Sequence, residues 1–281
     1  MVSSYSSMST EPADARHGVP GEPMTMTLAG HGAIDAAAPI VFTHGVFMDH
    51  TMWDPVRDAL DVSSLALDMP GHGASPPVAA TTLDDHVAAV AASLERAGAS
   101  GCVVVGHSWG GMTALRLAIR RPDLVAGLVL CNTPLRRTSG VSRLGFIAQR
   151  LAVSAHVAPL PFFAAQAAKS LFDADVLAAR PELVTAMQTR LSAMGRHNLS
   201  DTLRSVLLEP DDALGLLLDQ LNVPWRFVAG RDDYVLSGGV AVRLERTAQL
   251  VRVPGGHMTP LEQPDAVVNA IGQVRTAVDR G

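Results

Sequence analysis

Several kinds of residue are scarce in this sequence, and each scarcity excludes a class of protein or of partner. Its 281 residues include only two cysteines, Cys102 and Cys131, which lie in short apolar runs typical of buried strands. Two cysteines in a chain of this size do not make a disulfide scaffold. Lysine occurs once, at Lys169, and the arginines form no extended run. With a net charge of −5 and interspersed charges, the chain is not expected to bind nucleic acid.

Targeting and membrane signals are equally sparse. Residues 1–22 have neither a basic stretch nor an apolar run, so we expect a disordered leader and a cytoplasmic protein. Leu151–Ala168 has no formal charge, but it is only 18 residues long and contains Pro159 and Pro161. The prolines favour an apolar helix-turn-helix that covers a pocket, and we expect no membrane span.

Apolar runs alternate with helical patterns in the first half of the chain and return near its end. Predicted strands cover Met24–Leu28 (a weak edge strand), Pro39–Thr43, Ser64–Leu67, Cys102–Val105, Val125–Leu130, Trp225–Ala229 and Leu250–Val253. Predicted helices cover Thr51–Leu60, Thr82–Ala97, Trp109–Arg120 and Pro264–Val278. Because parallel strands need crossover connections, this order predicts an α/β fold with a mostly parallel central sheet and helices on both faces.

The alternation breaks between the fifth and sixth of these runs. The stretch is rich in alanine and leucine, is interrupted by prolines, and shows no strand pattern. We therefore predict a helical cap inserted at residues 134–208, on a core formed by residues 23–133 and 209–281.

One short stretch, VVVGHSWGGM over residues 103–112, points to chemistry. Ser108 follows an apolar strand, precedes a helical pattern and has Gly106 and Gly110 on either side. A serine hydroxyl becomes a nucleophile only beside a base and oxyanion donors. A sharp strand-to-helix turn exposes the hydroxyl and points the next helix's N-terminus at the site, and its neighbours must be small. The alternative is an ordinary loop with a helix-capping serine.

Together with two other motifs, this turn resembles the α/β-hydrolase family over about Met24 to Val278. His44-Gly45-Val46-Phe47, with Trp53 downstream, is similar to the family's oxyanion loop. Asp68-Met69-Pro70-Gly71-His72-Gly73-Ala74-Ser75 is similar to its glycine-rich loop. The resemblance implies the order Ser, Asp or Glu, then His.

That order leaves three histidines for the base. His257 lies in PGGHMTPLEQP, which directly follows a strand and resembles the family's histidine loop, so we predict His257 as base. His156 and His197 are expected to be cap residues, and Glu262 a capping charge for the last helix. Asp233 is the predicted acid and Asp232 the alternative, because the family places the acid three residues after the glycine in GRDD.

The mechanism follows from these roles. His257 takes the Ser108 proton, Asp233 orients the imidazole, and the backbone N–H groups of Val46 and Trp109 bind the oxyanion, with Phe47 as an alternative donor. Expected pocket residues, all apolar, are Phe47, Met112, Phe146, Phe162, Phe163 and Met258. His44, His72 and His107 are expected to brace loops.

The resemblance and the apolar cap imply a serine hydrolase acting on an ester, lactone or thioester of a small hydrophobic acyl substrate. The sequence is similar to the esterase, enol-lactonase and perhydrolase group of that family. An acyltransferase and a carbon–carbon bond hydrolase are alternatives, although the latter typically carries tryptophan where this chain has Met258. A non-catalytic ligand-binding protein is the alternative of another class. No dinucleotide-binding or phosphate-binding glycine motif and no Cys/His cluster occurs, so we expect neither cofactor nor metal.

Overall fold

The computed structural model describes residues 26, 28–31, 39–76, 82–135, 140–155, 159–204, 217–233 and 243–281. The predicted leader, residues 1–22, lies outside them.

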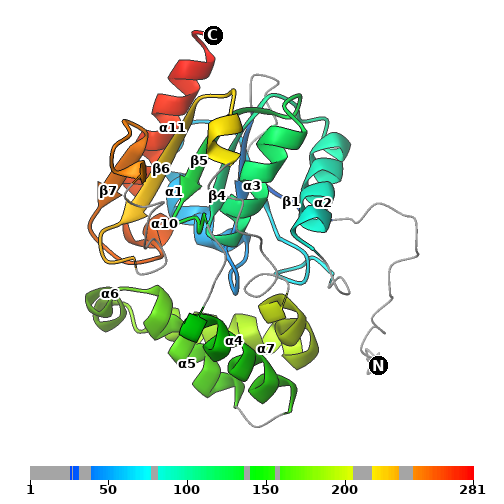
Figure 1. Cartoon of the computed structure of the whole chain (residues 1–281), viewed down its shortest axis with the longest axis vertical. Coiled ribbons are helices and arrows are strands. Elements are labelled where there is room, and N and C mark those ends of the chain that lie inside the picture. The colour runs from blue at the N-terminus through cyan, green and yellow to red at the C-terminus, as the bar shows by residue number, and fades with distance from the viewer. Residues whose placement is uncertain are drawn as a thin grey trace, which may run out of the picture.

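Seven strands form one central sheet (Figure 1). They are β1 (Leu28–His31), β2 (Ile40–Thr43), β3 (Ser64–Leu67), β4 (Cys102–His107), β5 (Val125–Cys131), β6 (Trp225–Gly230) and β7 (Leu250–Val253). Their spatial order is β1-β3-β2-β4-β5-β6-β7, and every neighbouring pair is parallel except β1 with β3. The mostly parallel sheet predicted from the alternating pattern is confirmed.

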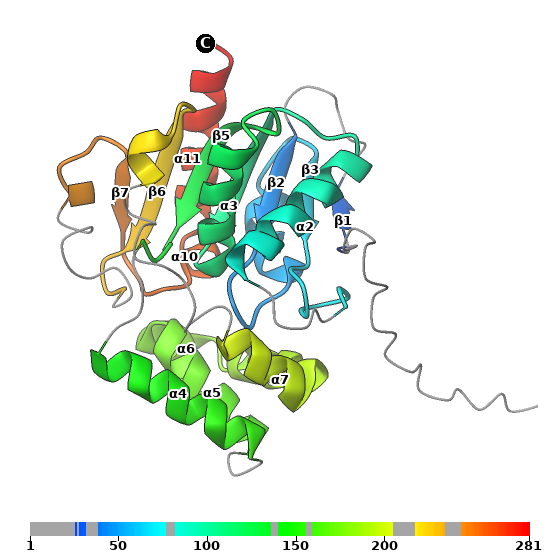
Figure 2. The same ribbon diagram turned by 45° about the vertical axis from the view of Figure 1, so that its right-hand side comes forward.

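Helices cover both faces of this sheet, which explains why its strands read as unbroken apolar runs. The helices are α1 (Asp54–Asp58, after the 3-10 turn η1, His50–Trp53), α2 (Leu83–Arg96), α3 (Trp109–Arg120), α10 (Thr259–Glu262) and α11 (Pro264–Val278). Figure 2 shows α2 and α3 on one face of the sheet and α11 on the other. All residues of β2, β3 and β4 are buried. The resulting core holds the loops at the strands' carboxyl ends in fixed positions.

Most of the predicted edge strand, Met24–Leu28, lies outside the described residues. The weak alternation over Met24–Leu28 predicts a strand there, but β1 begins at Leu28 and ends at His31. Its position is fixed by antiparallel pairing with β3, in which Leu28 lies opposite Leu67 and His31 opposite Ser64. Pairing partners distant in sequence set the register of a strand, and local alternation does not reveal them.

In the described part of the connection from β5 to β6, four helices lie as a separate layer beneath the sheet in Figure 1. They are α4 (Gly140–Ser154), α5 (Leu160–Leu171), α6 (Ala174–Ala179) and α7 (Glu182–Thr202), and the 3-10 turn η3 (Leu218–Gln220) precedes β6. The backbone of α7 is kinked at Gly195, where φ is 72°. Within the described part of the chain, none of the helices combines the length and the apolar character that a membrane crossing requires.

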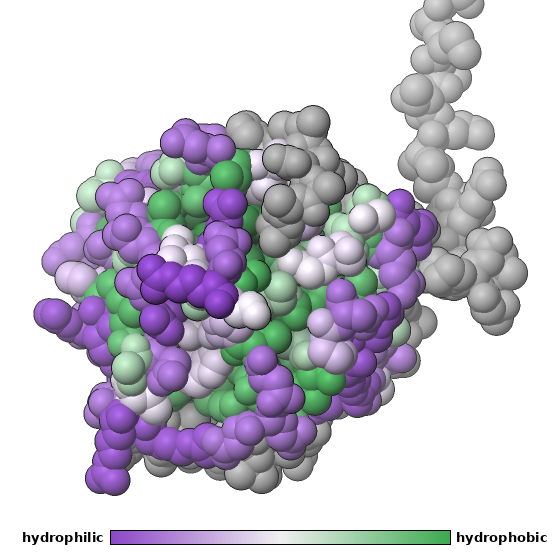
Figure 3. All heavy atoms as spheres, turned by 90° about the horizontal axis from the view of Figure 1, so that it is seen from above, coloured by the Kyte–Doolittle hydropathy of each residue, from purple (hydrophilic) through white to green (hydrophobic). Residues whose placement is uncertain are grey.

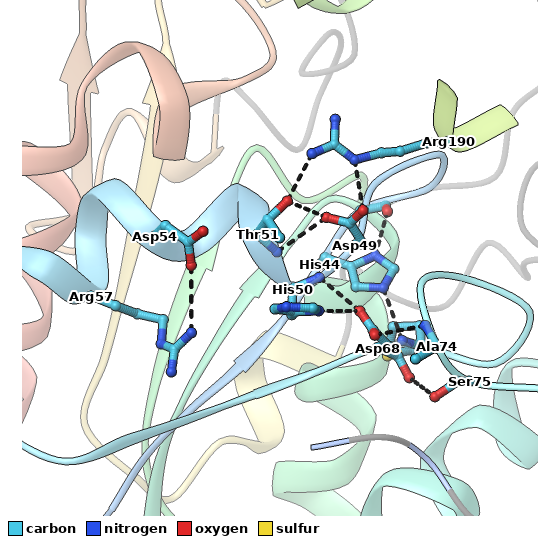
Figure 4. Close-up of polar contacts among 12 residues, drawn as sticks. His44, Asp49, His50, Thr51, Asp54, Arg57, Asp68, Ala74, Ser75 and Arg190 are labelled. Carbon is cyan, nitrogen blue, oxygen red and sulfur yellow. Dashed lines mark hydrogen bonds and ion pairs between the residues drawn. The ribbon is translucent and has the colours of Figure 1, made fainter. Parts of the chain in front are cut away.

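Polar contacts fasten these helices to loops of the core. Arg190 of α7 forms an ion pair with Asp49, its Nε lying 2.8 Å from Oδ2, and donates a 2.8 Å hydrogen bond to Thr51 Oγ1 (Figure 4). Burial alone would raise the pKa of Asp49, but the hydrogen bond and charge of Arg190 outweigh it and hold that pKa below its usual value. Seen from the side away from these helices, the surface mixes hydrophilic and hydrophobic side chains (Figure 3).

Candidate active site

Ser108 occupies a strained turn between β4 and α3. Its φ is 50°, a backbone conformation that is energetically unfavourable for residues other than glycine. The turn is possible because its neighbours lack side chains. A Cβ on Gly106 would lie 2.6 Å from Cα of Gly111, and one on Gly110 would overlap the carbonyl oxygen of Thr43. The glycines therefore permit the close backbone approach that lifts Ser108 out of the strand.

The structure brings Ser108, His257 and Asp233 together from three strand ends. His257 Nε2 lies 3.0 Å from Ser108 Oγ, and His257 Nδ1 lies 3.1 Å from Asp233 Oδ1. A carboxylate only accepts, so Nδ1 carries the proton and Nε2 is left to accept from the serine hydroxyl. All three residues are buried, whereas the alternative acid, Asp232, is exposed. This is the arrangement in which a histidine can remove a serine proton.

Asn132, directly after β5, also contacts the acid, and the sequence did not single it out for a role. Its Nδ2 donates to Asp233 Oδ2 at 2.7 Å and to the Gly256 carbonyl oxygen at 3.2 Å. Its Oδ1 accepts from the Thr259 hydroxyl. Asn132 is fully buried with φ at 47°, a conformation that asparagine tolerates better than most residues. Its side chain therefore holds the carboxylate against the histidine loop, Pro254–His257.

Two backbone amides near Ser108 are available for an oxyanion. Trp109 N–H is at the first position of α3, where helix amides have no partner in the helix. Among the described residues, the N–H groups of Trp109 and Val46 have no hydrogen-bond acceptor. The amide of Phe47, the alternative donor, instead donates to His72 Nε2 at 3.3 Å. In the loop His44–Phe47, which the sequence resemblance predicts to be the oxyanion loop, the Phe47 amide is therefore occupied and the Val46 amide is not.

Neutral histidines brace this loop and its neighbours, as the sequence predicts. His44 Nε2 accepts from the Met69 amide at 2.9 Å, so its Nδ1–H donates to the Gly45 oxygen at 2.7 Å. Burial lowers the pKa of His44. It also lowers the pKa of His72 to about 3. These rings stay uncharged at neutral pH and hold backbone groups in place.

His107, the residue before Ser108, joins the elbow to the histidine loop. Its Nε2 donates to the backbone oxygen of His257 at 2.8 Å. Burial lowers the pKa of His107 to about 3, so the ring is neutral. A Cβ on Gly45 would overlap His107 Nδ1, which shows that the ring also packs against the oxyanion loop.

Backbone strain among the described residues is concentrated around Ser108. Three residues other than glycine have a positive φ there, namely Phe47 at 66°, Ser108 at 50° and Asn132 at 47°. Each follows a parallel strand and belongs to the oxyanion loop, the turn or the contact to Asp233. Strained conformations persist where the surrounding structure over-determines them, which is typical of functional sites.

Asp68, in the loop after β3, bonds to the segment after β2 and to its own loop (Figure 4). Its Oδ1 accepts from the amide of His50 at 2.8 Å and lies 2.9 Å from the His50 ring, and its Oδ2 accepts from the amide of Ala74 at 2.9 Å. Asp68 is fully buried. It therefore fixes this loop beside the segment that carries Asp49.

Apolar side chains predicted for the pocket come from the loop after β2, from α3, from α5 and from the start of α10. Phe47, Met112, Phe163 and Met258 are buried, and the Phe47 and Phe163 rings make an edge contact at 5.7 Å. Phe162, also predicted for the pocket, is 62% exposed. Adjacent residues of a helix point in directions about 100° apart, and α5 buries Phe163 and Ala164 on the face that leaves Phe162 outside. The side chain of Phe146 lies outside the described residues.

His197 is a solvated residue of α7, one of its two expected positions, whereas Glu262 differs from its expectation. The side chain of His197 is 95% exposed and lies 3.4 Å from Asp201, while His156 lies outside the described residues. Glu262, predicted as a capping charge of the last helix, belongs to α10 and accepts from the backbone amides of Asp173 and Gly256. Within the described ranges, no group of three His, Cys, Asp or Glu side chains could hold a metal ion.

Comparisons with known proteins agree with this architecture. A lipase from Mycobacterium tuberculosis, LipV, is 29% identical over 83% of this chain and 92% of its own length. The pimeloyl-[acyl-carrier protein] methyl ester esterase of Nitrosomonas europaea is 30% identical over 82% of this chain and 92% of its own. The enol-lactonase of Burkholderia xenovorans LB400 has a similar fold, with a TM-score of 0.78, 20% identity, and coverage of 89% of this chain and 96% of that one.

The family model described as alpha/beta hydrolase matches residues 40–270, from β2 into α11. These limits enclose the oxyanion loop, the Ser108 turn and the histidine loop. With lipase and esterase relatives over most of its length, the chain is an enzyme of the hydrolase class. This chain belongs to the alpha/beta hydrolase family.

Proposed function

We propose that this enzyme is a serine hydrolase that cleaves an ester, lactone or thioester of a small hydrophobic substrate through an acyl-enzyme. The observation that carries the proposal is the continuous relay from Ser108 Oγ to His257 Nε2 at 3.0 Å and from His257 Nδ1 to Asp233 Oδ1 at 3.1 Å. A buried polar residue with a purely structural role can bond to any partner. In this order of contacts, however, the serine has a base and the base has a carboxylate that orients it.

In the first step Ser108 Oγ attacks the substrate carbonyl carbon while its proton passes to His257 Nε2. Asp233 stabilises the resulting imidazolium through the Nδ1 proton that it already accepts. The negative charge on the carbonyl oxygen is bound by the amides of Val46 and Trp109, and loss of one such donor typically raises the barrier by about 3 kcal/mol. His257 then protonates the leaving alcohol or thiol, and the acyl-enzyme forms. In the second half, His257 removes a proton from water, which attacks the acyl carbon and releases Ser108.

The apolar surroundings support a hydrophobic acyl group. Phe47, Met112, Phe163 and Met258 are buried around the elbow and the cap helices, and such a lining binds substrate mainly by burial of apolar surface. The names of the relatives point the same way, because a lipase and a methyl ester esterase both hydrolyse esters. We propose that residues 134–208 form the cap; α4–α7 are the helices described within this range.

Covalent labelling with a fluorophosphonate tests the activated serine without assuming a substrate. We expect wild type to be labelled at Ser108 and Ser108→Ala not to be labelled. The control is Ser93→Ala, which removes another buried serine whose hydroxyl is bonded to the Ala89 oxygen at 2.8 Å; it should label like wild type. A folded wild type that stays unlabelled would refute the proposal and favour a non-catalytic ligand-binding protein.

A second assay separates hydrolysis from acyl transfer. With a p-nitrophenyl ester, hydrolysis releases the free acid, whereas transfer requires an added alcohol or thiol and yields a new ester. Release of free acid at a rate unaffected by added acceptors supports the hydrolase, and strict dependence on an acceptor would replace it with an acyltransferase.

A further inference from the structure

The connection between two cap helices is bonded directly to the loop that carries His257. The connection, Leu171–Asp173, joins the end of α5 to the start of α6. His257 N–H donates to the Leu171 carbonyl oxygen at 3.1 Å. A Cβ on Gly256 would lie 3.2 Å from the Asp173 nitrogen, a tight contact, so the two backbones lie close together.

One carboxylate bridges the two segments. Glu262 Oε1 accepts from the Asp173 amide at 3.0 Å, and Glu262 Oε2 accepts from the Gly256 amide at 2.6 Å. Each oxygen therefore serves a different segment, one on the cap and one beside His257. Hydrogen bonds to an ionised acceptor are stronger than neutral ones and strongly directional. A second contact, from Arg180 Nη1 to the Leu261 oxygen at 3.3 Å, ties α6 to α10 next to the same residue.

We propose that Glu262 is a positioning residue whose carboxylate clamps the cap segment Leu171–Asp173 to the histidine loop and thereby holds His257 in line with Ser108. The inference rests on the proposed function, in which His257 is the base. It assigns the carboxylate a role beyond helix capping, since cap docking and the placement of the base depend on the same two oxygens.

The role depends on having two acceptors. The side chain of glutamine has the same size but presents one oxygen and one NH2 group, which only donates. In Glu262→Gln one of the two amides, of Asp173 or of Gly256, faces a donor and loses its partner. The histidine loop or the cap segment must then shift, although the apolar contacts of both are unchanged.

A backbone variant removes the cap side of the clamp independently. Asp173 has φ −60°, which suits proline, and the preceding Phe172 has ψ 151°, which suits a residue before proline. Asp173→Pro removes the N–H that Glu262 Oε1 accepts. It also removes the side-chain cap on the Asp175 amide, so Asp173→Ala, which loses that cap but keeps the N–H, is its reference.

The experiment measures kcat and KM for p-nitrophenyl acetate in the full chain, with each rate divided by the Ser108 sites titrated by a fluorophosphonate. A small loss of base alignment is enough to lower kcat by roughly 10- to 100-fold. We expect that loss in Glu262→Gln and in Asp173→Pro relative to Asp173→Ala, with KM nearly unchanged because acetate makes little use of the cap. The double variant Glu262→Gln/Asp173→Pro should lose less than the product of the two single losses, since both disrupt the same bridge between the two segments. Glu95→Gln, an exposed glutamate on α2 that pairs with Arg121, is the matched control and should leave kcat unchanged.

The outcomes separate this role from the function on which it rests. If wild type is not labelled, the proposed function is refuted and the role of Glu262 with it. If wild type is labelled but kcat per titrated site is unchanged in Glu262→Gln, the clamp is structural only and the positioning role is refuted. If Glu262→Gln does not fold, the comparison of Asp173→Pro with Asp173→Ala decides, and equal kcat values in that pair overturn the proposal.

Discussion

Asn132 offers a sharp test of how the acid is held, because aspartate has nearly the same shape. In Asn132→Asp the acceptor toward the Thr259 hydroxyl is kept, and aspartate also tolerates the φ of 47°. What changes is the atom 2.7 Å from Asp233 Oδ2, which becomes a carboxyl oxygen instead of an N–H donor. Two carboxyl groups then share a buried position.

The size of the effect follows from Coulomb's law. Two unit charges about 4 Å apart repel by about 4 kcal/mol at an effective dielectric constant of about 20, which equals about 3 pKa units. We expect the introduced carboxyl to take up a proton in the folded protein, with a pKa near 7 against about 4 in the unfolded chain. While protonated, it can donate to Asp233 as the amide did.

The pH dependence has a definite sign. A group whose pKa is raised by folding contributes its stability fully below the unfolded pKa and loses it as pH rises through the folded pKa. The variant should therefore be close to wild type near pH 4, and its free energy of unfolding should fall behind by about 1.4 kcal/mol per pH unit until about pH 7. The total deficit is about 4 kcal/mol.

Urea unfolding of wild type, Asn132→Asp and Asn132→Gly at several pH values between 4 and 8 measures this difference. Glycine accommodates the positive φ and removes the side chain without adding charge, so its deficit should not vary with pH. A deficit of Asn132→Asp that is constant across the range would refute the reasoning, because it would mean that the two carboxyl groups do not interact.

Other variants test the acid, the turn and the cap contact. Asp233→Asn should lower kcat by about 10⁴-fold through the wrong imidazole tautomer, whereas Asp232→Asn, at an exposed side chain, should not; steady-state kinetics compares them. Ser108→Gly should raise the free energy of unfolding by about 1 kcal/mol by relieving the strained φ, and urea titration against Ser108→Ala measures it. Arg190→Met should lower the free energy of unfolding by about 1–2 kcal/mol through loss of the half-buried contact to Asp49. Because the pKa of Asp49 is lowered in the fold, that loss should persist at neutral pH and disappear as pH falls through the folded pKa.

Local patterns predicted most of the fold. The predicted bounds of Ser64–Leu67, Trp109–Arg120, Leu250–Val253 and Pro264–Val278 are those of β3, α3, β7 and α11. Each is marked by an apolar run or a helical period with a proline, glycine or capping residue beside it, and such signals act within one segment. The edge strand lacks a strong pattern, and its place depends on β3.

The residues of the site also divide into those that local sequence predicts and those that depend on distant partners. The elbow serine was recognisable because its chemistry forces small neighbours at fixed spacing, and the glycines have to lie beside it in the chain. Asn132 contacts Asp233, 101 positions away, and Glu262 contacts Asp173, 89 positions away. The sequence around Asn132 and Glu262 does not predict these partners. Composition shows that the helix with Phe162 and Phe163 is apolar, but only the structure shows that Phe163 is buried and Phe162 exposed.

The sequence by itself determined the order of strands and helices, the strained turn at Ser108 and the class of chemistry, because each of these is encoded by residues close together in the chain. Only the tertiary structure decided which groups meet. The parallel sheet brings the carboxyl ends of β4, β5, β6 and β7 to one edge. There His257 lies within hydrogen-bond distance of Ser108 and Asp233, and Asn132 within that distance of Asp233. Hydrogen bonds act over about 3 Å, and only packing of the whole domain fixes distances between distant segments that closely.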